Sequence, residues 1–153
     1  MKVLFICYAN VCRSFMAQEL LKKAVPEADV FSRGLYADPS YAVPPKVLAF
    51  LAEQGITPAP HTPTPLQAQD LQTADLILLM QQRHLDQLAD RYAQHSDKMY
   101  LLNDFAFGQE KDVADPISLS GKAFEKAAAQ LAQAVQAVAQ KAWARLVGVS
   151  QAF

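Results

Sequence analysis

Short apolar runs alternate with longer mixed segments along this chain. Each run is bounded by polar or turn residues, which is typical of strands buried within a parallel sheet. The runs are KVLFI at 2–6, DVF at 29–31, ADLILLM at 74–80, and KMYLL, which begins at Lys98. The pattern therefore predicts four buried strands.

The segments that follow these runs show the spacing of amphipathic helices. The first begins at Ser14, a residue suited to an N-cap, and stops before Pro26. The next, at 44–55, starts with proline and ends with glycine, and another spans Gln82 to Tyr92. The last carries an apolar stripe that should cover one face of the sheet, formed by Phe124, Ala128, Leu131, Val135, Val138, Ala142 and Leu146.

Strands that alternate with helices predict an α/β fold. Because crossovers between parallel strands are right-handed, we expect helices on both faces of a four-stranded, mainly parallel sheet. With 153 residues, about half of them apolar, the chain can bury one such core. We therefore predict a single three-layer domain over residues 1–153.

The charge and hydropathy of the chain limit which binding partners and which cellular location we expect. The 14 basic and 15 acidic residues nearly cancel, so no overall field should recruit nucleic acid or an anionic membrane. The apolar stretch at the N-terminus is too short for a signal peptide, and no later segment reaches the length of a membrane span. We expect a cytoplasmic protein that holds any anion locally.

Both cysteines of the chain lie in CYANVCRS, from Cys7 to Ser14, directly after the first strand. In a reducing compartment they are not expected to form a permanent disulfide. Two cysteines alone cannot complete a structural zinc site, and we predict no metal and no other cofactor. This segment therefore favours catalysis or redox chemistry.

The turn from this strand into a helix is a favourable place for an anion. Ligands in α/β folds bind where strand ends turn into helices, and the N–H groups of residues 8–13 should converge there. The same field stabilises a thiolate at Cys7, and Arg13 offers a planar fork for two phosphate oxygens. The alternative is that Cys7 and Cys12 are small buried apolar residues and Arg13 a surface charge.

The stretch VLFICYANVCRSFMAQELL resembles the opening of the low-molecular-weight protein tyrosine phosphatases, whose loop reads C-x-G-N-x-C-R-S. SRGL after the second strand, ADLILLM and the Asp-Pro segment VADPIS at 113–118 resemble later parts of that family in the same order. The likeness covers nearly the whole chain. It is greatest for a bacterial branch that also includes protein arginine phosphatases.

This resemblance implies hydrolysis of phosphotyrosine in proteins through a phosphocysteine intermediate. Cys7 would be the nucleophile, Arg13 and the loop amides would hold the phosphoryl oxygens, and Asp115 would act as general acid and then base. Ser14 would hydrogen-bond to the Cys7 sulfur. Inorganic phosphate or another oxyanion should bind the same phosphate loop, whose other residues are Tyr8, Ala9, Asn10, Val11 and Cys12.

The resemblance also implies support behind the loop. Asn10 matches a family asparagine that is braced by a serine and a histidine, and Ser32 and His61 stand at those places. A plain loop position among prolines is the alternative for His61. The other histidines, His84 and His95, lie in polar sequence and are predicted to be on the surface.

Cys12 could protect an oxidised Cys7. A cysteine five residues along a curled loop can lie close enough to capture a Cys7 sulfenic acid as a disulfide. We therefore expect redox regulation with Cys12 as the resolving cysteine, and packing alone is the alternative. Arsenate reductases that share this fold need a further cysteine, which this chain lacks.

Several residues depart from the family pattern. Ala9 replaces a loop glycine, and a positive φ there would cost on the order of 1 kcal/mol. Ile117 replaces an aromatic residue that lies beside the substrate, and Tyr36 or Tyr41 could supply the missing ring. The remaining departures are Phe15 in place of proline and Gln18 in place of glutamate.

Position 11 bears on the substrate. The arginine phosphatases have threonine there, whereas Val11 keeps the shape of threonine without its hydroxyl. We therefore predict a preference for phosphotyrosine, with protein arginine phosphatase as the alternative. A weakly active phosphate-binding or redox-sensing module is a further alternative, because Ala9 and the acid loop are altered.

Overall fold

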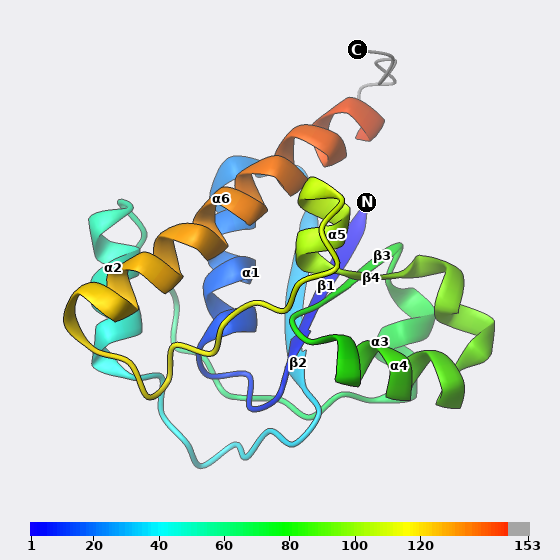
Figure 1. The fold of residues 1–153 in the computed structure, drawn as a ribbon, viewed down its shortest axis with the longest axis horizontal. Helices are drawn as coiled ribbons and strands as arrows, with labels where there is room; N and C mark the ends of the chain where they lie inside the picture. Colours follow the sequence, from blue (N-terminus) through cyan, green and yellow to red (C-terminus); the bar gives the residue numbers. More distant parts are fainter. Residues whose placement is uncertain (147–153) are drawn as a thin grey trace.

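The computed structural model describes residues 1–146, with side chains described as far as residue 141 (Figure 1). Two parts of the sequence predictions lie outside the described residues. They are the end of the predicted domain, 147–153, and the inward-facing side chains proposed for Ala142 and Leu146.

Four parallel strands form the sheet, in the order β2-β1-β3-β4. They are β1 (Lys2–Cys7), β2 (Asp29–Gly34), β3 (Leu76–Leu79) and β4 (Met99–Leu101). The predicted sheet is confirmed. Strand β2 extends beyond the predicted DVF to Gly34, because this edge strand buries only alternate residues and its polar positions concealed its length.

Seven helical segments connect and cover these strands within the described residues. They are α1 (Arg13–Ala24), α2 (Pro45–Glu53), α3 (Ala68–Thr73), α4 (Gln82–Arg91), the 3₁₀ helix η1 (Ala93–Lys98), α5 (Leu102–Phe107) and α6 (Gly121–Leu146). The sequence predicted α1, α2, α4 and α6. It missed the other three, whose few residues are too short for an amphipathic period to stand out.

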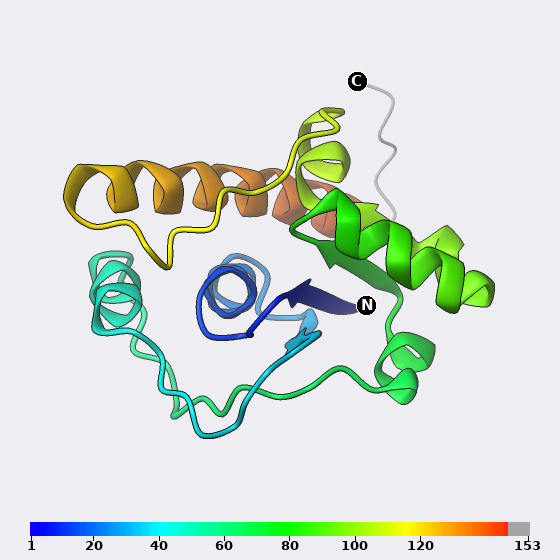
Figure 2. The ribbon, with the colours of Figure 1, turned by 60° about the horizontal axis from the view of Figure 1, so that its bottom comes forward.

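The helices form a layer on each face of the sheet. Val3 and Phe5 of β1 pack into one apolar core with α1, α2, α5 and α6, and in Figure 2 α6 passes above α1. Leu4 and Ile6 point to the opposite face and pack with residues of α3 and α4. Because successive residues of a strand face opposite sides, a strand covered on both faces reads as the continuous apolar run seen in the sequence.

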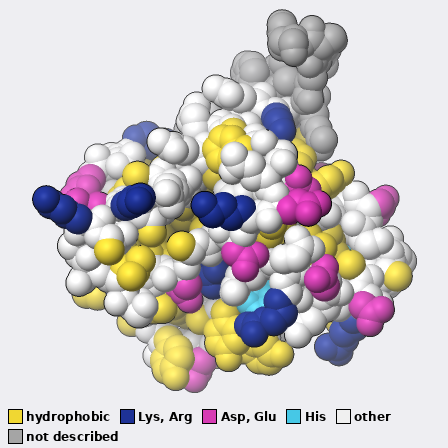
Figure 3. Space-filling view, viewed as in Figure 1, with side chains coloured by type: hydrophobic (Ala, Val, Ile, Leu, Met, Phe, Trp, Pro, Cys, Tyr) yellow, Lys and Arg dark blue, Asp and Glu magenta, His cyan; other side chains and the backbone are white. Residues whose placement is uncertain are grey.

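The distribution of surface charge and the composition of the helices are relevant to binding of nucleic acid or a membrane. Basic and acidic side chains are interspersed over the face shown in Figure 3. None of the helices in the described part of the chain combines the length and the apolar content needed to span a bilayer.

Candidate active site

The loop after β1 curls into the N-terminus of α1, with Cys7 as the last strand residue and Cys12 at the N-cap position. Asn10 has φ of 60° and is the only described non-glycine residue with a positive φ. Asparagine tolerates this region better than most residues. Ala9 does not adopt it, so the strain considered for a β-carbon at Ala9 does not arise.

Ser14 lies within the first turn of α1, so the prediction that it caps the helix is wrong. Its Oγ lies 2.9 Å from Cys7 Sγ and accepts a hydrogen bond of 2.8 Å from Asn10 Nδ2. Because the amide occupies a lone pair of Ser14, the hydroxyl hydrogen is free to point at the sulfur. The backbone N–H of Asn10 also donates to Cys7 Sγ, over 3.3 Å. Donors in these positions stabilise a thiolate.

Asn10 is braced from three directions. Its Nδ2 donates to Ser32 Oγ at 2.9 Å, and its carbonyl accepts a hydrogen bond of 2.8 Å from His61 Nε2. Its Oδ1 accepts from the backbone N–H of Thr64 at 3.0 Å. The structure thus brings Ser32 and His61 to the places that the resemblance implied. It adds Thr64, which acts through its backbone and gives no signal in the sequence.

Two residues of α1 that depart from the family pattern, Phe15 and Gln18, support the side chains that hold Asn10. Ser32 Oγ donates to Gln18 Oε1 over 2.6 Å. The Phe15 ring stacks on the His61 ring with centroids 4.2 Å apart. Gln18 and Phe15 therefore hold the two side chains that hold Asn10.

Gly34, the last residue of β2, lets the strand approach the loop closely. A β-carbon there would lie 2.9 Å from the Tyr8 carbonyl oxygen and 3.0 Å from the Ala9 carbonyl carbon. Beyond it the backbone N–H of Tyr36 donates to the Tyr8 carbonyl over 2.9 Å. The end of β2 thus fixes the first residues of the phosphate loop.

A cavity of about 110 Å³ is enclosed by residues 7–13 together with Asp115 and Ile117. Arg13 is buried beside it, and Nη1 of its guanidinium donates to the carbonyl of Val113 at 3.0 Å. Its Nη2 donates to Gln81 Oε1 at 3.2 Å and lies 3.5 Å from Asp115 Oδ2. The structure therefore brings Cys7, Arg13 and Asp115 to one cavity.

The sequence did not predict Gln81 or Val113 at this site. Val113 contributes a backbone carbonyl, which no side-chain pattern reveals. Gln81 follows shortly after β3 in the chain, at the carboxyl ends of the parallel strands, where ligands of α/β folds bind. This position was the feature of the sequence that could have indicated its role.

The segment that carries Asp115 is tied to two parts of the fold. Asp115 Oδ1 accepts a hydrogen bond of 3.1 Å from the backbone N–H of Ile117, which forms a local turn, and the Asp115 side chain is 48% exposed. Lys46 of α2 donates to the carbonyl oxygens of Ile117 and Leu119. These contacts hold Asp115 at the rim of the cavity.

Aromatic rings lie on one side of the cavity. Tyr8 lines it and packs against Tyr36, with ring centroids 5.0 Å apart, and both rings are exposed. Tyr41 is also exposed but is not among the described residues that line the cavity. Tyr36 does not line the cavity either, but its ring packs against that of Tyr8, which does.

The surface position predicted for His84 is wrong, since only 1% of this residue is exposed. It shares a face of α4 with buried Leu88, and the polar neighbours of both residues obscured that face in the sequence. Its ring lies 6.2 Å from that of Tyr8, and its Nδ1 has no hydrogen-bond partner within the described structure. Burial, together with Arg83 and Arg13, lowers the pKa of His84 against an opposing effect of Asp112.

His84, which is buried, and His61, which is partly buried, should make the fold sensitive to acid. Burial is also the main cause that lowers the pKa of His61, against the opposing hydrogen bond to Asn10. The unfolded chain, with histidine pKa values of about 6.5, therefore binds more protons than the folded chain. The free energy of unfolding should be highest above that pH and should fall as the pH drops toward the lower folded-state values.

Urea unfolding of the wild type and His61→Gln at pH 7 and pH 5 checks this prediction. The variant should lose less free energy of unfolding between the two pH values, because one of the two titrating groups is gone. An identical loss in both proteins would contradict it.

Cys12 is buried and unpaired with Cys7. Burial, reinforced by the negative charges of Asp115 and Cys7, raises the pKa of Cys12 to about 12, although Arg13 and Lys46 oppose the shift. Cys12 is therefore a protonated thiol at neutral pH.

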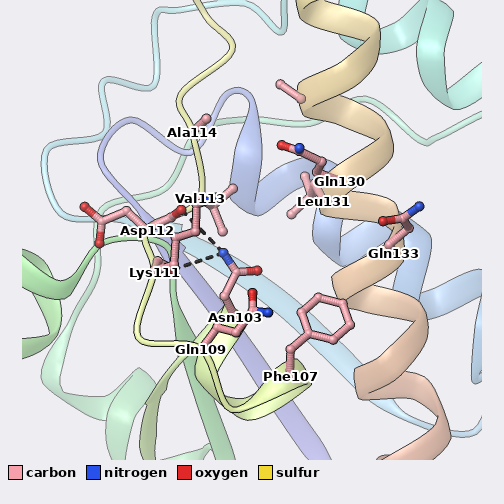
Figure 4. Close-up of a pocket in the computed structure, with 11 residues that line it drawn as sticks. Asn103, Phe107, Gln109, Lys111, Asp112, Val113, Ala114, Gln130, Leu131 and Gln133 are labelled. Carbon is pink, nitrogen blue, oxygen red and sulfur yellow. Dashed lines mark hydrogen bonds between the residues drawn. The ribbon is translucent and has the colours of Figure 1, made fainter.

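A larger cavity of about 430 Å³ lies between α5, α6 and residues 109–114 (Figure 4). Asn103 Nδ2 donates to the carbonyl of Lys111 at 2.9 Å and borders this space. Its walls are mainly carboxamide and apolar side chains, and none of the described residues that line it also lines the cavity beside Cys7. Within the described residues no three His, Cys, Asp or Glu side chains are grouped to hold a metal ion.

Comparison with known proteins places these features in a family. Residues 2–146 match the family model described as low molecular weight phosphotyrosine protein phosphatase. A protein-arginine-phosphatase of Bacillus subtilis is 28% identical over 145 residues, covering 92% of this chain and 96% of that protein. The probable low molecular weight protein-tyrosine-phosphatase EpsP of Ralstonia solanacearum is 31% identical over 135 residues, covering 88% of this chain and 91% of that protein.

The solved structures agree with the fold. The YwlE arginine phosphatase from Geobacillus stearothermophilus superimposes with a TM-score of 0.89 at 28% identity, covering 99% of both chains.

Proposed function

The chain belongs to the low molecular weight phosphotyrosine protein phosphatase family, and on that premise we propose that it hydrolyses phosphotyrosine in proteins through a phosphocysteine on Cys7. One observation carries the proposal. Cys7 Sγ receives hydrogen bonds from the loop in a cavity that also holds Arg13 and Asp115. A nucleophile, an oxyanion-binding group and a proton donor therefore face one small volume.

The first step forms the intermediate. The Cys7 thiolate attacks phosphorus, so that an S–P bond forms as the bond from phosphorus to the tyrosine oxygen breaks. The loop N–H groups and Arg13 hold the phosphoryl oxygens, whose charge is spread in the transition state. Asp115 gives its proton to the departing oxygen.

The second step releases phosphate. Water attacks phosphorus, Asp115 accepts a proton from the water, and the S–P bond breaks to return the thiolate. The Ser14 hydroxyl, 2.9 Å from the sulfur, stabilises that leaving group. No metal or other cofactor takes part in this proposal.

Hydrolysis of p-nitrophenyl phosphate by the protein with its cysteines reduced tests the proposal. Turnover supports a phosphatase. Binding of inorganic phosphate without turnover would favour the alternative of a phosphate-binding or redox-sensing module.

Protein arginine phosphatase is a second candidate. The relatives named arginine phosphatases cover nearly the whole chain, which favours it. Val11 argues against it, because this buried residue lines the cavity and has no hydroxyl for a guanidinium. The rings of Tyr8 and Tyr36 also offer an aromatic surface for phosphotyrosine.

Val11→Thr should shift the preference toward phosphoarginine. An unpaired polar group facing the valine methyl costs roughly 1–3 kcal/mol, so the ratio of kcat/KM values should change by about five- to a hundredfold. The measurement is kcat/KM of wild type and variant on one peptide carrying either phosphorylated residue. A wild type that already prefers phosphoarginine would overturn the role given to Val11.

We also propose that oxidation regulates the enzyme. Peroxide would oxidise the Cys7 thiolate to a sulfenic acid, and Cys12 would then displace water to form a disulfide. Because the Cys12 thiol is protonated at neutral pH, this closure should be slow, and part of Cys7 should be oxidised further.

Mild peroxide should therefore inactivate the enzyme, with partial recovery in thiol reductant. Cys12→Ser should recover less than the wild type. Mass spectrometry that finds no disulfide between Cys7 and Cys12 after oxidation would refute this mechanism.

The remaining parts of the proposal are a single domain over residues 1–153, a cytoplasmic location and no nucleic-acid partner. The interspersed charges of Figure 3 support the last of these.

A further inference from the structure

Outside the phosphate loop, three oxygen atoms of the described residues lie near the guanidinium of Arg13, and two of them are neutral acceptors. Nη1 donates to the Val113 carbonyl at 3.0 Å, and Nη2 donates to Gln81 Oε1 at 3.2 Å. The third neighbour, Asp115 Oδ2, lies 3.5 Å from the same Nη2. Gln81 and Asp115 therefore share one nitrogen of Arg13.

The contact of Nη2 with both Gln81 and Asp115 affects oxyanion binding by Arg13 and proton donation by Asp115. A neutral acceptor leaves the positive charge of Arg13 available for phosphoryl oxygens, whereas a tight carboxylate partner would offset it. A closer contact with Nη2 would also occupy Asp115 Oδ2, an oxygen through which the carboxyl group can pass a proton to the leaving group. The partner that holds Nη2 thus influences both oxyanion binding and proton donation.

The backbone fixes Gln81 in place for this contact. Gln81 is the extended N-cap residue of α4, with φ of −135° and ψ of 137°. On one side Met80 N–H donates to the Ile6 carbonyl at 3.2 Å, and on the other Gln82 N–H donates to Asp112 Oδ1 at 2.8 Å. Gln81 is thus anchored both to the sheet and to the segment that leads to Asp115.

We propose that Gln81 is a positioning residue that holds Nη2 of Arg13 with a neutral acceptor and so keeps Asp115 free to protonate the leaving group. This inference rests on the roles proposed for Arg13 and Asp115. Gln81 acts through these two side chains and does not itself contact the reacting atoms.

Gln81→Met tests the effect on proton donation, because methionine keeps the length of glutamine without its oxygen. Without that oxygen, Nη2 should move closer to Asp115 Oδ2, which lies 3.5 Å away in the wild type. The value of kcat/KM should fall about tenfold for phenyl phosphate, which needs its leaving group protonated, and by no more than about twofold for p-nitrophenyl phosphate. Gln82→Met, which changes an exposed neighbour, is the control and should leave both values unchanged.

An equal loss on both substrates, or no loss on either, overturns the proposal. A merely structural role for Gln81 would produce the equal loss, since it would not distinguish leaving groups.

Gln81→Glu tests the effect on the oxyanion without depending on turnover. A carboxylate at this position should pair with Arg13 and weaken the binding of inorganic phosphate about tenfold, measured by calorimetry. Unchanged phosphate affinity overturns the proposal. A wild type that binds phosphate but does not hydrolyse p-nitrophenyl phosphate would instead count against the proposed function, and the Gln81→Glu measurement would still decide this inference.

Discussion

Cys7→Ser should lower kcat for p-nitrophenyl phosphate by more than about 10⁴-fold, because a serine hydroxyl does not ionise at neutral pH and is a poor nucleophile toward phosphorus. Serine differs from cysteine at one atom, so the buried loop should keep its shape. The hydrogen bonds that converge on Cys7 Sγ come from Ser14 and Asn10, and neither residue is changed.

Two further measurements separate lost chemistry from lost structure. The variant should unfold at nearly the same temperature as the wild type and should still bind inorganic phosphate. Activity within tenfold of the wild type would remove Cys7 from the role of nucleophile.

Asp115→Asn should lower kcat/KM by about 10²–10³-fold for phenyl phosphate and much less for p-nitrophenyl phosphate, whose good leaving group departs without a proton. Asparagine keeps an Oδ1 that can accept the Ile117 N–H, so the local turn should persist. Kinetics on the two substrates measure the difference.

Asp112→Asn is the matched control, since Asp112 lies in the same segment and its Oδ1 accepts the Gln82 N–H. It should not change the ratio of kcat/KM values between the two substrates. Equal losses on both substrates in Asp115→Asn would remove Asp115 from the role of general acid.

The parts of the site that lie together in the sequence could be predicted from local chemistry, whereas Ser32, His61 and Asp115 were predicted through the family resemblance. Cys7, Arg13 and Ser14 occupy one turn after the first apolar run, so strand geometry and side-chain chemistry point to the same loop. The sheet was predictable for a related reason, because β1 and β3 are buried on both faces and leave continuous apolar runs.

Contacts made by backbone groups could not be predicted, and neither could side-chain contacts that the family pattern does not contain. The Thr64 N–H and the Val113 carbonyl carry no side-chain signal, although one braces Asn10 and the other holds Arg13. Phe15 appeared only as a departure from a pattern, and its stacking on His61 depends on a loop that returns to α1.

Two errors have a common cause. Local residue preferences predict a helix cap at Ser14, beside the hydrogen bond to Cys7 that the resemblance implies, and a surface position for His84. Tertiary contacts determine both positions. The Ser14 hydroxyl forms hydrogen bonds with Cys7 and Asn10, and the buried ring of His84 lies near that of Tyr8.

Detection of the intermediate tests the central claim most directly. The reduced protein would be mixed with p-nitrophenyl phosphate, quenched rapidly in acid, digested and analysed by mass spectrometry. We predict one phosphoryl group on Cys7 in the peptide that contains the phosphate loop, and none in the Cys12 position. Turnover of the substrate without any phosphoryl group on Cys7 would contradict the proposed mechanism.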